Sequence, residues 1–276
     1  MERVRDGLGG AYRVRRGGEF LLLVACDEDR AGEVLQCLNR VLREIRERLR
    51  FLGEERGLGL LPVVALGSLT DFYRYLADYT QVEGEYAAVG GVYINQGYGH
   101  FAFPGLDLAR CRETLIHETA HAVLAAHALP MWLDEALVAF LERSLLGASP
   151  YALDRETVRR HRAYWTAGRI QGFWRGETFW SPDEGQELSY HLAAFLLEAA
   201  AGRAGSDLAQ LAEFVRNADR LDGGAAAAIG HLDLAFGEVL EGLLGPGDWE
   251  PRPSGTGPSD RGEAGRPETS DNPIST

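Results

Sequence analysis

The feature that most constrains the fold of this chain is the pentapeptide His-Glu-Thr-Ala-His at 117–121. On an α-helix, His117 and His121 lie one turn apart on the same face, so both imidazoles can bind one zinc ion. Glu118 lies beside that face and can reach a water molecule on the metal. The pattern therefore predicts a helix whose side chains hold a metal.

The residues around this pentapeptide favour a buried helix. The run 114–126 contains no Gly or Pro and is apolar almost all round outside the motif, as in helices that lie inside a core. Two histidines and a carboxylate in such a helix are costly without partners, and a metal ion supplies them. The alternative is a surface or core helix whose two histidines are only hydrogen-bonded.

Glu135, fourteen residues after His121, is the expected third ligand. His127 has the spacing of a longer zinc motif, but that motif needs a glycine where this chain has Leu124, so the helix should carry His127 away. Asp134 competes with Glu135, and we expect it to cap the helix start instead. Two histidines, one glutamate and an open fourth position form a hydrolytic zinc site, with one Zn²⁺ per chain.

The whole pattern, HExxH followed by a proline and then W-L-x-E, resembles that of the gluzincin metallopeptidases. It is most similar to the compact, peptidase-MA-like bacterial members. The matching residues are His117, Glu118, His121, Pro130, Trp132, Leu133, Glu135 and Ala139. The family glycine after the glutamate is Ala136 here, and the acidic residue that the thermolysin branch carries four places after the glutamate is Ala139. The resemblance is specific over 114–140 and implies a zinc-dependent peptidase acting on a peptide or protein.

The expected mechanism uses a metal-activated water with Glu118 as the general base, which passes the proton to the leaving amine. The tetrahedral intermediate then needs a hydrogen-bonding or cationic group for its oxyanion. Tyr190 is the first candidate and His191 the second, because proteins similar to this one often carry a tyrosine on a helix in this region. The alternative for an aromatic residue at a helix start is packing.

Hydrophobic periodicity predicts an α+β, zincin-like fold over 1–244. Residues 1–107 should form a small mixed sheet with helices, and 108–244 the active-site helix and a mainly helical part. Residues 245–276, rich in Pro, Gly and Ser, should be a disordered tail. The expected strands are 19–26, 60–66, 87–95 and 97–103, and the expected helices are 30–52, 71–79 (capped by Ser68 or Thr70), 108–128, 132–146, 153–168, 186–201, 206–219 and 231–243.

The segment 90–104 has two interpretations. In zincins an edge strand ahead of the active-site helix pairs with an extended substrate, and several side chains here could line such a rim. The alternative is a hairpin with glycines at its turn and aromatics on the core. The residues concerned are Gly90, Gly91, Tyr93, Tyr98, His100 and Phe101.

The formal charge of −13 argues against a nucleic-acid partner. Three cysteines without short spacing favour free thiols in a reducing compartment. The N-terminus lacks an apolar signal region, and the longest apolar run, 20–26, is too short to span a membrane. These features predict a cytoplasmic protein with no membrane partner, and they do not indicate an oligomeric state.

Two other functions remain open at this point. One is a zinc-bearing domain that binds or scaffolds a partner with little or no hydrolysis, although such a site has no need of the general base Glu118. The other is hydrolysis of an amide that is not a peptide.

Overall fold

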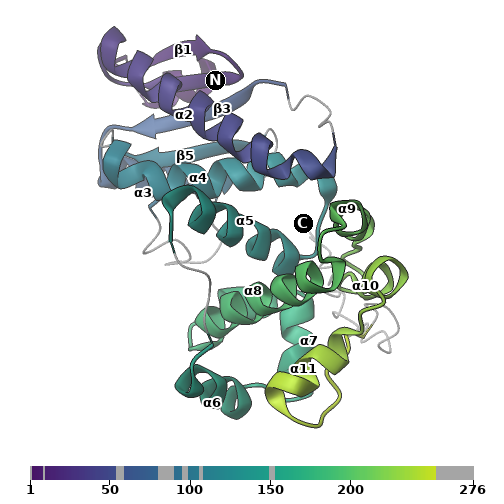
Figure 1. Cartoon of the computed structure of the whole chain (residues 1–276). Coiled ribbons are helices and arrows are strands. Elements are labelled where there is room, and N and C mark those ends of the chain that lie inside the picture. Colours follow the sequence, from purple (N-terminus) through teal and green to yellow (C-terminus); the bar gives the residue numbers. More distant parts are fainter. Residues whose placement is uncertain are drawn as a thin grey trace, which may run out of the picture.

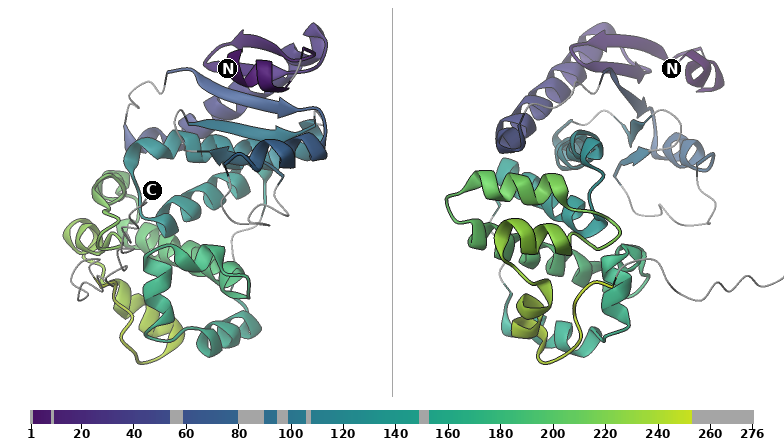
Figure 2. Two further views of the ribbon diagram at one scale, coloured as in Figure 1. Left: turned by 180° about the vertical axis from the view of Figure 1, so that it is seen from behind. Right: turned by 90° about the vertical axis from the view of Figure 1, so that its right-hand side faces the viewer.

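The computed structural model confirms an α+β fold with a small N-terminal mixed sheet and a mostly helical remainder (Figure 1). The described residues are 2–8, 10–53, 59–79, 90–94, 99–105, 108–148 and 153–252. The sheet and its helices lie at one end of the molecule, and the helices after α5 lie at the other, as both views of Figure 2 show. None of the helices in these ranges is long and apolar enough to cross a bilayer.

The five strands lie in the order β1-β2-β3-β5-β4. They are β1 (Arg13–Gly17), β2 (Phe20–Val24), β3 (Leu61–Leu66), β4 (Val92–Ile94) and β5 (His100–Pro104). The central strands β2, β3 and β5 are parallel, whereas the edge strands β1 and β4 are antiparallel to their neighbours. The predicted strands 19–26 and 60–66 are present as β2 and β3. Of the predicted strands 87–95 and 97–103, residues 87–89, 95 and 97–98 lie outside the described residues, and the rest contains β4 and most of β5. The arginine-rich strand β1 was not predicted.

Each face of the sheet is covered by helices. The helices α2 (Glu28–Leu49) and α4 (Leu108–Leu124) pack on the face that presents Leu22, Val63 and Phe101. The helix α3 (Leu69–Leu76) packs on the opposite face, against Val64 and Ala102. Alternation along the strands assigns these residues to opposite faces. α3 is capped by Ser68, one of the two predicted caps, whose hydroxyl accepts from the N–H of Asp71.

The second half of the chain is helical. Its helices are α5 (Met131–Leu146), α6 (Arg155–Tyr164), α7 (Arg169–Trp174), α8 (Gly185–Ala204), α9 (Leu208–Asn217), α10 (Ala225–Leu232) and α11 (Phe236–Leu244). Of these, α7 and most of α10 were not predicted, and two of the predicted helices have different bounds. The helix predicted over 231–243 is confirmed from Phe236 on, as α11, but its predicted start is wrong: α10 ends where Asp233 takes a positive φ of 49°, and α11 begins three residues later. The predicted helix 153–168 ends at Tyr164, because Trp165 is extended.

Short 3-10 turns and α1 complete the described elements. They are α1 (Glu2–Leu8), η1 (Arg50–Leu52), η2 (Ala125–His127) and η3 (Glu177–Trp180). The turn η2 follows α4 directly, and Ala128 then adopts a left-handed conformation with φ 50°. This short connection turns the chain so that α5 packs against α4.

The start of α5 is anchored in the helical half. Trp132 is fully buried, and its indole N–H donates to the carbonyl of Gly223 at 2.9 Å. Arg220 donates to the carbonyl of Leu129, just before the helix, at 2.8 Å. Because both bonds fix the chain three to six residues before Glu135, they also help to fix where that carboxylate lies.

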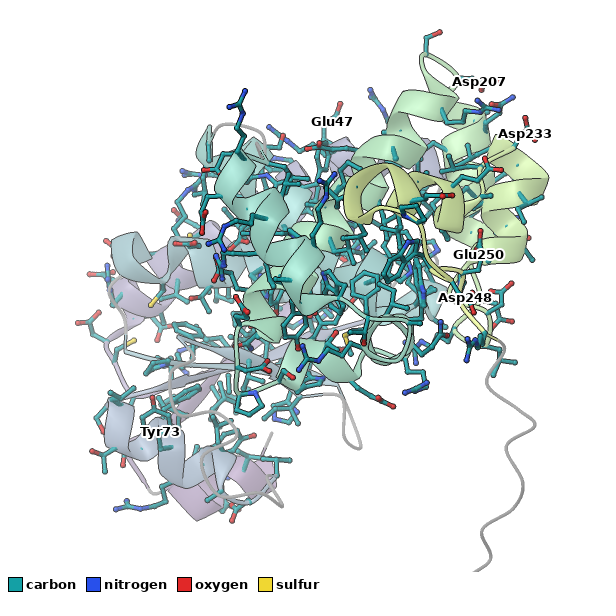
Figure 3. The ribbon with its side chains drawn as sticks, turned by 90° about the horizontal axis from the view of Figure 1, so that it is seen from below. Glu47, Tyr73, Asp207, Asp233, Asp248 and Glu250 are labelled. Atoms are coloured by element: carbon teal, nitrogen blue, oxygen red, sulfur yellow. The ribbon has the colours of Figure 1, made fainter. Side chains whose placement is uncertain are left out.

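The predicted start of the disordered tail, residue 245, is corrected, because 245–252 pack on the helical half. Trp249 is 7% exposed, and its backbone carbonyl accepts from the indole of Trp174 at 2.9 Å. Glu250 accepts from the N–H of Gly237 at the start of α11. Figure 3 labels Glu250 and its neighbour Asp248 on this segment. The remainder of the predicted tail, 253–276, lies outside the described residues.

Replacing Trp249 by Ala should lower the free energy of unfolding by about 3 kcal/mol, because it removes a large buried ring. Denaturant unfolding measures the change. The matched control is Trp180→Ala, since Trp180 is 59% exposed and should change stability by about 0.5 kcal/mol or less. Equal effects of the two substitutions would contradict a packed 245–252 segment.

Candidate metal centre

The three predicted metal ligands converge in the structure. One ligand atom each of His117, His121 and Glu135 lies within 4.8 Å of the other two. The Nε2 atoms of the two histidines are 3.1 Å apart, and Nε2 of His121 is 3.7 Å from Oε2 of Glu135. α4 supplies both histidines and α5 supplies the glutamate, so residues from two packed helices meet at one point.

Asp134 is not a helix cap, and that prediction is wrong. The cap position of α5 is Pro130, which offers no side-chain acceptor. Asp134 lies in the first turn of the helix and accepts from Nδ1 of His121 at 2.8 Å. Asp134 lies a full turn after the cap position, so the Asp134 carboxylate does not cap the helix and can point toward α4. It holds the ring so that Nε2 faces Glu135.

Glu142 is a further site residue that the sequence analysis did not single out. Its Oε2 lies 3.5 Å from Nδ1 of His117. Glu142 follows Glu135 by seven residues, which is two helical turns, so both lie on one face of α5. That spacing was a signal in the sequence. Each histidine therefore directs Nδ1 toward a carboxylate and Nε2 toward the centre, which is how histidine ligands of metals are commonly oriented.

The carboxylate of Glu135 is buried, and one of its oxygens has no hydrogen-bond partner among the described residues. The residue is 6% exposed, and the oxygen concerned is Oε2. Burial raises its pKa, and the neighbouring histidines oppose that shift. A buried carboxylate oxygen without a partner is costly, and a metal held between it and two imidazoles would satisfy it.

The electrostatics of His121 also favour a cation. Burial lowers its pKa, but the hydrogen bond to Asp134 and the charges of Glu135, Asp134 and Glu118 outweigh burial and raise the pKa to about 9. The carboxylates thus generate a negative potential at the point where the ligand atoms meet. Two imidazole nitrogens and a carboxylate oxygen form a donor set that suits zinc, so the residues present fit the predicted metal.

Glu118 lies beside this group, as its position in the motif predicts. It is 8% exposed, and its carboxylate accepts from the backbone N–H of Tyr93 on the edge strand β4. Burial raises its pKa, while His117, His121 and the Tyr93 N–H pull the pKa down. A carboxyl group with a raised pKa is better suited to accept and return a proton near neutral pH.

Gly91 explains how β4 comes so close to α4. A Cβ atom at this position would lie 2.4 Å from Cγ2 of Thr114 and 3.2 Å from the carbonyl oxygen of Ala102. Only glycine fits between the helix and the neighbouring strand without displacing one of them. The close approach brings the Tyr93 N–H to Glu118.

Other residues of the 90–104 segment are packed away from the ligands. Nε2 of His100 is 2.7 Å from the hydroxyl of Tyr75, on the sheet face that α3 covers. Phe101 is stacked on Phe103 in the core. Tyr98 lies outside the described residues. Phe101 also lines a small cavity together with Tyr93 and Glu118. Within the part of the segment that is described, β4 and Phe101 therefore lie beside Glu118, whereas the side chain of His100 lies on the opposite face of the sheet.

The structure separates the two oxyanion candidates. Burial raises the pKa of Tyr190, and the charges of Glu135, Glu118 and Glu142 add to that rise, so its hydroxyl lies within electrostatic range of three carboxylates of the cluster. The ring is held edge-on against Phe179, with centroids 5.3 Å apart.

His191, the next residue on α8, belongs to a different group of side chains. Its ring lies 6.0 Å from that of His161, and its Nε2 is 3.9 Å from Glu187. Burial lowers its pKa, and the charges that act on it include those of Glu187, Arg160 and Asp154, none of which belongs to the ligand group. The structure brings Tyr190 to the site and leaves His191 out of it. His127, in η2, is also not part of the ligand group.

No protein-family model matches this chain, and no curated protein matches it either. The arguments about its chemistry therefore depend on the side chains and on the motif at 114–140. The geometry brings four of the predicted residues, His117, Glu118, His121 and Glu135, into one buried cluster.

Asp134→Asn and Glu142→Gln should each weaken zinc binding by about 10- to 100-fold, because each variant loses the carboxylate that orients one histidine. Competition against a chromogenic chelator measures the affinity. The control is Glu113→Gln, an exposed carboxylate on α4, which should leave the affinity unchanged. Wild-type affinity in both site variants would mean that these carboxylates do not support the metal.

Proposed function

We propose that this chain is a zinc-dependent peptidase, with His117, His121 and Glu135 as the metal ligands and Glu118 as the general base. The observation that carries the proposal is the meeting of the three ligand atoms within 4.8 Å beside a buried glutamate. A structural zinc site has four protein ligands, whereas this cluster offers three and leaves one position for water or substrate.

The arrangement of the sheet and helices supports a zincin-like assignment of the gluzincin type. The helix that bears the motif, α4, packs under a mixed sheet whose edge strand β4 is antiparallel to its neighbour. The third ligand comes from the following helix, α5, after a short turn. The resemblance at 114–140 predicts both features.

The backbone of β4 supplies a surface for an extended peptide. Among the described strands, β4 is at the edge of the sheet and is bonded to β5 on one side. The N–H of Tyr93 points to Glu118, so this edge of the strand borders the metal centre. An extended substrate that adds its backbone to such an edge would bring a peptide bond past the ligands.

Within this site each group has a distinct chemical task. A bound zinc ion would lower the pKa of a water molecule and polarise the carbonyl of the substrate. Glu118 would accept the proton of the water and deliver it to the leaving amine. Tyr190, whose raised pKa keeps its hydroxyl protonated at neutral pH, would donate a hydrogen bond to the developing oxyanion.

Replacing Glu118 by Gln should abolish peptide hydrolysis while zinc stays bound, because the amide cannot accept the proton. The measurement is turnover of a fluorogenic peptide library, with metal content measured on the same preparation. Glu113→Gln on the same helix is the control and should keep full activity. Hydrolysis at the wild-type rate by a zinc-loaded Glu118→Gln variant would rule out this mechanism. Zinc-loaded wild-type protein that hydrolyses nothing in the library would favour the binding or scaffold function.

Tyr190→Phe should lower kcat by about 10²- to 10³-fold with little change in KM, because the lost hydrogen bond acts in the transition state. The matched control is His191→Gln, its neighbour on α8, which should change kcat by less than about twofold since it does not face the cluster. The same peptide assay compares the variants. A large loss of kcat in His191→Gln with none in Tyr190→Phe would reverse the assignment.

A further inference from the structure

A pocket lies on the far side of α5 from the candidate metal centre. Its volume is about 490 Å³, within the range of sites that hold small organic ligands. Its walls are apolar side chains from the end of α2 and from η1, α5, α8 and α9. They include Leu49, Phe51, Leu137, Phe140, Leu197 and Leu211.

The two sites use opposite faces of α5. Residues on a helix advance by about 100° each, so Glu135 and Glu142 lie on one side, and Leu137, Phe140 and Ser144 on the other. A ligand in the pocket would therefore not touch the metal ligands. On α8, by contrast, Tyr190 and the pocket residue Ala201 are eleven residues apart and share one stripe that faces α5.

Part of the apolar wall is left uncovered. Phe140 is 46% exposed although it lies at the pocket. An exposed aromatic ring at the mouth of an apolar pocket gains free energy when an apolar ligand covers it.

Two arginines give the pocket a positive border in a chain of net charge −13. The guanidinium of Arg48 donates to the hydroxyl and the carbonyl of Ser144, at 2.7 and 3.4 Å, and it pairs with no carboxylate of the described chain. Arg143, half-buried, is the second. The pocket also has one acidic lining residue, Glu198. Because Glu198 lines a neighbouring pocket that contains His191 as well, it lies at the boundary between the two pockets.

We propose that this pocket binds an apolar small molecule with an anionic head group, of the fatty-acid class. The hydrocarbon portion would lie between Leu137 and Leu197, cover Phe140, and place the carboxylate at Arg48. Because Nε and Nη2 of Arg48 already donate to Ser144, the carboxylate would accept from the remaining N–H groups of the guanidinium, for which a carboxylate is the best acceptor.

Calorimetric titration of the full chain with decanoate, below the concentration at which it aggregates, tests the proposal. We expect one decanoate per chain, and binding about tenfold weaker for decan-1-ol, which lacks the charge. Arg48→Gln should weaken decanoate binding by about tenfold, to the level of decan-1-ol. Arg50→Gln, which removes an exposed arginine paired with Glu47 outside the pocket, should have less than about a twofold effect.

Ala201→Trp should abolish binding because the indole fills the pocket. Ala199→Trp, on the opposite side of α8, is its control, and circular dichroism checks that both variants fold. If decanoate binds Ala201→Trp as tightly as it binds the wild type, the pocket is not its binding site. That result would also be seen if decanoate bound at the candidate metal centre, and it would overturn the proposal. Absence of binding to the wild type would also overturn it, and equal affinity for decan-1-ol would overturn the anionic head group.

Discussion

The packing of α5 against α4 is the constraint on which the candidate site depends. It places the carboxylates of Asp134, Glu135 and Glu142 against two imidazoles in a largely buried space. Buried carboxylates are unfavourable unless positive charge compensates them. A protonated His121, whose pKa the hydrogen bond to Asp134 and the surrounding carboxylates raise to about 9, would provide part of that compensation. A divalent ion would provide more, and would also satisfy the Glu135 oxygen that has no hydrogen-bond donor among the described residues.

Much of the site was predictable because its residues follow helix geometry. The four-residue spacing of the histidines and the apolar surroundings required a buried helix, and the proline before Met131 required a new one. The orientation of Asp134 was not predictable, because it depends on where α4 passes rather than on α5 alone. Glu142 was missed although its spacing from Glu135 was visible in the sequence, since nothing in α5 itself shows that His117 needs a second partner.

Helices and strands with a regular hydrophobic periodicity were predicted from the sequence. Elements that depend on tertiary contacts were missed. Strand β1 has no alternation of apolar and polar residues. It forms because its backbone pairs with the edge of β2. The break at Asp233 requires a positive φ in a residue other than glycine, which sequence patterns seldom indicate. The composition of 245–252 is typical of a disordered segment, but in the structure the backbone carbonyl of Trp249 accepts a hydrogen bond from the indole of Trp174 on α7. Helices α5 and α8 were predicted, and they border both the metal centre and the apolar pocket.

The most direct test of the account is the metal content and zinc K-edge X-ray absorption of the full chain, purified without chelator. The account predicts one zinc per chain, bound by two imidazole nitrogens at about 2.0 Å and by oxygen, with no sulfur ligand. A chain that neither retains zinc nor takes it up, or one whose zinc is bound by thiolate, would contradict the assignment of His117, His121 and Glu135.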